Sequence, residues 1–90
     1  MVMGYNTDIR HHGVVYHIQT EPRKDNGIDT TVYMQGTVIH KLKSSCEHPT
    51  GSPKVRDEEL QRRLEAQHRL VIARIRAGEI KPLAQSAKPA

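Results

Sequence analysis

A chain of 90 residues with 36% hydrophobic residues and a net charge of +4 at pH 7 can bury one small core, which excludes a second domain. No segment has the roughly 20 consecutive apolar residues of a membrane helix, and the first residues lack the apolar stretch of a secretory signal, so we expect a cytoplasmic protein. Because Cys46 is the single cysteine, the chain can form neither an internal disulfide nor a four-thiolate zinc site.

The first predicted element is a β-hairpin around the dipeptide His12-Gly13. A two-residue loop that ends in glycine suits the positive φ angles of a tight turn. The turn fixes the pairing of the flanking strands and gathers their apolar side chains on one face. The predicted cross-strand pairs are Thr7 with Ile18, Asp8 with His17, Ile9 with Tyr16, Arg10 with Val15, and His11 with Val14.

A second hairpin is predicted after a polar loop over residues 21–27. Its strands run from Ile28 to Met34 and from Thr37 to Ser45, joined by a tight turn at Gln35-Gly36. Glutamine suits the first position of such a turn less well than asparagine or aspartate. The expected pairs are Val32 with Ile39 and Tyr33 with Val38.

The last predicted element is one long amphipathic helix, about residues 53–77. Ser52 can cap its first amides, Pro53 tolerates the first helical position, and Gly78 is placed to end it. One narrow arc must face the sheet. This arc consists of Leu60, Leu64, Val71 and Ile75 and is widened by His68 and Ile72.

The elements together predict an α+β fold, a small antiparallel β-meander of about four strands followed by one long C-terminal amphipathic α-helix. We expect one domain over residues 1–80, with the sheet at about 5–46, and a disordered tail over 81–90.

A second, weaker strip on the helix is the first candidate binding surface. Small side chains there permit close approach of another protein, although good helix formers on a solvated surface are the commoner explanation. The strip contains Val55, Ala66, Leu70, Ala73 and Ala77, and a line of arginines lies beside it. The candidate partner-binding residues are Arg56, Arg63, Leu70, Ala73, Arg74 and Ala77.

A polar group on the sheet is the second candidate site. A carboxylate beside an imidazole fixes the tautomer of the ring and raises its basicity, as an acid-base site requires, although an ordinary cross-strand pair on a solvated face is the commoner outcome. The group consists of Asp8, His17, Gln19, Thr31, Tyr33 and His40.

Catalytic and metal-binding signatures are absent from the sequence. It contains no nucleophile elbow, no phosphate-binding glycine loop and no paired carboxylates. Among the six histidines no two have the i,i+4 spacing of a helical metal site, and Cys46 with His48 is one isolated pair. We therefore expect no enzyme, no metal and no cofactor.

Two interaction classes remain. The first 50 residues carry five basic and five acidic side chains, whereas residues 51–90 carry nine basic and five acidic ones, so a nucleic-acid partner would bind the helix. Against this reading, three arginines have acids one turn before them, and the sheet lacks exposed aromatic pairs that stack on bases. The thin core, the second strip and the short exposed sheet edges favour a protein partner, including a homodimer.

Several short segments resemble a small family of bacterial proteins without assigned function. The segments are Tyr5-Asn6-Thr7-Asp8, Val15 to Glu21, the hairpin from Val32 to Gly36, Gln67-His68, and Arg76-Ala77-Gly78, and they span most of residues 4–79. The chain departs from that family at Gln35, where a second glycine is favoured, and at Ser45-Cys46, where Ser-Tyr is expected. The resemblance implies a bacterial, cytosolic protein and brings no activity, cofactor or catalytic residue with it. The sequence thus predicts a non-catalytic module that binds a protein partner or itself through the helix surface or a sheet edge.

Overall fold

A computed structural model of the protein describes residues 2–45 and 51–80. Four strands precede one helix, as predicted. They are β1 (Tyr5–His11), β2 (Val14–Pro22), β3 (Gly27–Met34) and β4 (Thr37–Ser45), and the helix is α1 (Pro53–Arg76). Cys46, His48 and the expected tail over 81–90 lie outside the described residues. The α+β fold class is therefore confirmed.

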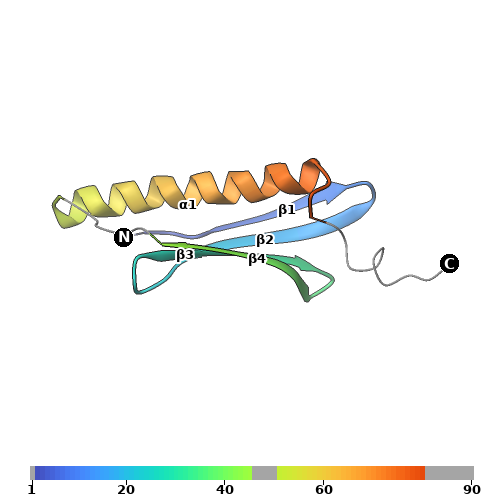
Figure 1. Cartoon of the computed structure of the whole chain (residues 1–90), viewed down its shortest axis with the longest axis horizontal. Helices are drawn as coiled ribbons and strands as arrows, with labels where there is room; N and C mark the ends of the chain where they lie inside the picture. Colours follow the sequence, from blue (N-terminus) through green and yellow to red (C-terminus); the bar gives the residue numbers. More distant parts are fainter. Residues whose placement is uncertain (1, 46–50, 81–90) are drawn as a thin grey trace.

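The sheet is an antiparallel meander with the strand order β1-β2-β3-β4. Helix α1 runs along one face of the sheet, mainly over β2 and β1, and to a smaller extent over β3 (Figure 1). No element among the described residues covers the opposite face, which we call the open face. The two outer strands, β1 and β4, form the edges of the sheet.

The first hairpin has the predicted register at every pair, including Asp8 with His17 and Ile9 with Tyr16. Its loop residues His12 and Gly13 have φ angles of 51° and 78°. Two successive positive φ angles define a type I′ turn, whose twist matches that of paired strands. This turn explains why the register could be predicted from the sequence.

The second hairpin contains a β-bulge that the sequence did not predict. Tyr33 pairs with Val38 as expected, but the predicted pair of Val32 with Ile39 is wrong, because Val32 pairs with His40. Without the bulge, Leu42 would point to the open face and the lysines beside it toward the helix. With it, Leu42 packs against the core while Lys41 and Lys43 are exposed. The cost of burying two charged amines therefore favours the bulge.

The core lies between the sheet and the predicted arc of α1. Leu64, Val71 and Ile75 are fully buried, and Leu60 and Ile72 are half-buried. The buried residues Ile9, Tyr16, Ile18 and Val32 of the sheet pack against them, joined by Ile80 from the segment after the helix.

Both predicted helix ends are present. The Ser52 hydroxyl accepts a hydrogen bond from the amide of Val55 at 3.4 Å. At the other end, Gly78 has a φ of 79°, and the amide of Glu79 donates to the carbonyl of Arg74. This is the glycine-terminated end that satisfies the last carbonyls of a helix. The described residues contain no helix that combines the length and the apolar composition needed to cross a bilayer.

Candidate functional site

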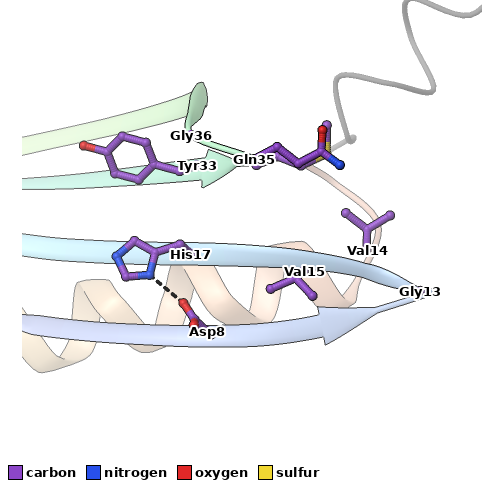
Figure 2. A pocket seen from close by; sticks show the side chains of 9 residues that line it. Asp8, Gly13, Val14, Val15, His17, Tyr33, Gln35 and Gly36 are labelled. Atoms are coloured by element: carbon purple, nitrogen blue, oxygen red, sulfur yellow. Dashed lines mark hydrogen bonds and ion pairs between the residues drawn. The ribbon is translucent and has the colours of Figure 1, made fainter.

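The polar group on the open face is centred on a contact between Asp8 and His17. The Nδ1 atom of His17 and the Oδ1 atom of Asp8 are 2.5 Å apart, and both side chains are well exposed. The Tyr33 ring lies beside the imidazole, with ring centroids 5.9 Å apart. Figure 2 shows the three side chains projecting from β1, β2 and β3. The sequence predicted the contact of Asp8 with His17 correctly because the first hairpin turn sets the register of β1 and β2, whereas Tyr33 is placed beside His17 by the pairing of β2 with β3.

A shallow hollow of about 560 Å³ surrounds these three side chains. Val15 lines it on one side, and the glycines of the two hairpin turns, Gly13 and Gly36, lie at its end (Figure 2). The hollow is thus a broad concavity of the open face rather than an enclosed cavity.

Three residues of the predicted group, Gln19, Thr31 and His40, do not line the hollow. Gln19 is on the open face opposite Thr31, but its amide donates to Glu21, away from the hollow. The prediction for His40 is corrected: because of the bulge it pairs with Val32, and cross-strand partners share a face. His40 therefore belongs to the helix side of the sheet, where it is half-buried.

The hollow contains one carboxylate-imidazole pair as its acid-base chemistry. If Nδ1 of His17 donates to the Asp8 carboxylate, Nε2 of the neutral ring is left as a proton acceptor. However, the lining residues include no serine, threonine, cysteine or lysine that this acceptor could activate. Within the ranges 2–45 and 51–80, no group of three or more His, Cys, Asp or Glu side chains could hold a metal ion.

The second strip of α1 is exposed along the helix. Leu70 is 45% exposed and Val55 48%. The other predicted partner-binding residues are also exposed, apart from Arg74, which is half-buried. Arg63 is held by Glu59 at 3.3 Å, and Arg69 is held by Glu65 at 2.5 Å, so part of the basic charge on the helix is already paired.

Sequence reasoning missed a chain of buried polar side chains between α1 and the sheet. The Gln67 amide nitrogen faces the carbonyl of Leu42 at 3.2 Å, which fixes the orientation of the amide, and it also donates to the Thr30 hydroxyl at 2.9 Å. The Gln67 carbonyl accepts from Ser44 at 2.5 Å. Thr30 in turn lies 2.8 Å from the Thr20 hydroxyl.

His68 completes this chain. Its Nδ1 lies 2.8 Å from the Thr20 hydroxyl, and its Nε2 lies 2.8 Å from the Thr7 hydroxyl. If Thr30 donates to Thr20 and Thr20 donates to Nδ1, the neutral ring carries its proton on Nε2 and donates to Thr7. Each donor from Ser44 to His68 then has an acceptor, as buried polar groups require, and the chain ends at the half-buried Thr7 hydroxyl. His68, which was predicted to widen the buried arc of the helix, is thus a buried bridge between the helix and two strands.

The two edges of the sheet differ in their accessibility to another strand. His11 and Val14 flank the two-residue loop and therefore form a hydrogen-bonded pair. Counting from His11, every second residue of β1 directs its backbone amide and carbonyl toward β2, and the residues between them direct these groups outward. The outward residues are Asn6, Asp8 and Arg10, and all three are exposed. Strand β4, in contrast, is interrupted by the bulge and carries two exposed lysines, which are features that discourage edge pairing.

The β1 edge is also held in place at its start. The side chain of Gln61 on α1 accepts from the amide of Met3 and donates to the carbonyl of Met3, each at 2.9 Å. It further contacts the Tyr5 hydroxyl at 3.1 Å. The edge is therefore ordered before any partner binds, which lowers the entropic cost of pairing.

Comparisons with known proteins found no matching protein-family model, curated protein or solved structure.

Proposed function

We propose that the protein is a non-catalytic, cytoplasmic bacterial module that binds a protein partner through the free edge of β1. The observation that supports this proposal is the contrast between the two edges. The β1 edge is regular, exposed and balanced in charge between Asp8 and Arg10, whereas β4 is bulged and carries lysines. Natural sheets usually protect exposed edges, so one edge that has no bulge and carries balanced charges favours a role in pairing.

Strand addition supplies the physical basis of this binding. A partner strand satisfies the outward amides and carbonyls of β1, and these backbone bonds provide affinity. Side chains on the two faces of the added strand then provide specificity. On the open face, the hollow with Tyr33 lies two strands from this edge and offers an aromatic contact to a partner that extends across the sheet.

A proline scan of the two edges tests the proposal. In Arg10→Pro, the lost amide is one that points outward, so pairing with β2 is retained while a partner strand is blocked. The matched control is Lys41→Pro. Lys41 is next to Leu42, whose pair with Thr30 faces inward, so by the alternation Lys41 directs its amide outward from β4. Immobilised wild type and both variants are exposed to a lysate of the source organism, and bound proteins are quantified by mass spectrometry.

We expect a bound protein that Arg10→Pro loses and Lys41→Pro retains, and we expect the far-UV circular dichroism of both variants to match that of the wild type. Equal capture by all three chains would contradict binding through the β1 edge. The same assay includes an untagged copy of this chain, so that self-capture is detected.

Nucleic-acid binding through α1 is the second candidate. It is supported by the net charge of the C-terminal half, but Arg63 and Arg69 are engaged by acids of the same helix. Fluorescence anisotropy with mixed DNA and RNA at low salt tests it, and a flat titration would exclude it. A ligand-binding or small enzymatic role would require the hollow at Asp8 and His17. His40 does not line this hollow, because it belongs to the helix side of the sheet.

A further inference from the structure

We infer that the partner of the β1 edge is a second copy of this chain, paired antiparallel with the first about a two-fold axis at Ile9. This inference rests on the proposed binding function of that edge and adds the identity of the partner and the register. A symmetric dimer requires a surface that is complementary to itself, because each residue meets its own symmetry mates. The β1 edge meets this requirement in one register.

Three self-pairing registers join the outward residues of β1 in at least two hydrogen-bonded pairs, because each such pair must join two outward residues. An axis at Asp8 places the two Asp8 carboxylates opposite each other, which is repulsive. An axis at Thr7 pairs Asn6 with Asp8 and leaves Arg10 without an opposite charge. An axis at Ile9 pairs Asp8 of each copy with Arg10 of the other, so two ion pairs form.

The groups that would form these ion pairs are accessible. The Asp8 side chain is 68% exposed, and its contact with His17 uses the Oδ1 atom, which leaves Oδ2 to accept from Arg10 of the other copy. Arg10 is exposed and forms no ion pair within the part of the chain that the structure describes. Both side chains project from the open face, on the same side as Val15 and His17.

The opposite face of the paired strands is also compatible. The two Ile9 side chains meet at the axis on the helix side, where Ile9 already belongs to the core. Because α1 lies mainly over β2 and β1, and strands lie about 4.8 Å apart, the helices of the two copies are about 10–14 Å apart. That separation is at or above the usual distance between packed helices, so they do not clash.

The other edge does not offer a comparable self-pairing. Lys41 and Lys43 are the charged side chains of β4, and neither has an acidic residue on the same strand. Antiparallel self-pairing of β4 would therefore bring lysines together, and the bulge would interrupt the ladder. One short strand per copy gives a small interface, so we expect a reversible dimer rather than an obligate one.

Reciprocal charge variants test the pairing. Asp8→Arg places arginines at both positions of the edge, and Arg10→Asp places aspartates at both, so each variant repels itself. An equimolar mixture of the two restores both ion pairs in a heterodimer, as does the double variant Asp8→Arg/Arg10→Asp in a homodimer. Sedimentation equilibrium over low to high micromolar protein measures the dissociation constants of all species.

We expect a concentration-dependent wild-type dimer, dimerisation weakened by about tenfold or more in each single variant, and recovery in the mixture and in the double variant. Glu21→Arg and Lys41→Asp change the net charge by the same amounts away from the β1 edge and should dimerise like the wild type. Far-UV circular dichroism verifies that every variant is folded.

Two results would overturn the inference. If the wild type is monomeric at high micromolar concentration, the second copy is not the partner. In that case, Arg10→Pro-sensitive capture of another protein would leave the proposed function standing. If the wild type dimerises but the charge variants do not change its dissociation constant, the dimer uses a different surface. If Arg10→Pro also has no effect on capture, both the inference and the proposed function fail.

Discussion

The imidazole of His68 joins α1 to β1 and β2 in the interior of the protein. It is 4% exposed, and its two nitrogens contact the hydroxyls of Thr7 and Thr20. Burial lowers the pKa of His68 from its ordinary value of about 6.5, because the charged ring loses its hydration. A protonated ring would also turn Nδ1 into a donor, so Thr20 would have to donate to Thr30 and the Thr30 hydroxyl would lose its acceptor. The neutral ring is therefore the form that the fold requires.

The stability of the protein should consequently fall as the pH is lowered below about 6.5. Below that pH the unfolded chain binds a proton at His68 more readily than the folded chain does, so protonation favours unfolding. The loss continues from the unfolded pKa down to the lowered folded pKa, with a slope of at most about 1.4 kcal/mol per pH unit for this one group. Urea unfolding between pH 8 and pH 5, followed by far-UV circular dichroism, measures the free energy at each pH.

The matched variant for this prediction is His68→Gln, which keeps a polar side chain but removes the titration. Its free energy of unfolding should be lower than that of the wild type at pH 8, since the fit to Thr7 and Thr20 is poorer. The free energy of unfolding of His68→Gln should also decrease less between pH 7 and pH 5 than that of the wild type. Equal slopes for the two proteins would show that His68 does not govern the acid response.

The tight turns of the two hairpins depend on residues that adopt a left-handed backbone. Gln35 occupies the first turn position of the second hairpin with a φ of 53°, followed by Gly36 at 80°. A residue with a β-carbon pays a steric cost there, which asparagine tolerates best among the non-glycine residues. Gln35 is exposed, so its replacement changes few other contacts.

We therefore expect Gln35→Asn to raise the free energy of unfolding by about 0.5 kcal/mol and Gln35→Val to lower it by about 1 kcal/mol or more. Thermal unfolding monitored by far-UV circular dichroism measures both differences. The control is the corresponding pair of substitutions at His12, which has a φ of 51° and should show the same order. If valine were tolerated as well as asparagine at both positions, the turns would not limit stability.

Elements whose geometry is set by neighbouring residues could be predicted from the sequence, whereas those that depend on contacts between distant residues could not. The first hairpin, including the contact of Asp8 with His17, could be predicted because a two-residue turn fixes every later pair. The second hairpin could not, since its bulge reflects the need to bury Leu42 and expose Lys41, which involves the helix across the sheet. The misplacement of His40 in the candidate site follows directly from that bulge.

The role of Gln67 was missed for a related reason. Leu64, Gln67, His68 and Val71 have the i, i+3, i+4, i+7 spacing of a buried face, and all four are buried. A polar residue at such a position signals a buried hydrogen bond, yet its partners Thr30, Leu42 and Ser44 belong to other elements. The pattern can thus indicate burial of the amide, but it cannot name its partners.

The whole molecule depends on one thin layer between the helix and the sheet. The buried side chains of the helix meet those of both hairpins, since Ile9, Tyr16 and Val32 belong to the same cluster as Val71 and Ile75. Without the sheet, the helix would expose its buried arc to water, and without the helix, the sheet would expose its half of the core. Helix and sheet should therefore unfold together as one cooperative unit.

Ile75→Ala tests this cooperativity, because Ile75 is fully buried in that cluster. The substitution should lower the free energy of unfolding by about 2–4 kcal/mol, a large share of the total for a chain of this size. Far-UV circular dichroism reports mainly on the helix, and near-UV circular dichroism of the buried Tyr16 reports on the sheet. At one fixed low micromolar concentration, both probes should give the same midpoint for the wild type and shift equally in the variant.

Exposed Ala73→Gly is the control for helix propensity alone, with a cost of about 1 kcal/mol. Separate midpoints for the two probes would mean that the sheet folds without its helix.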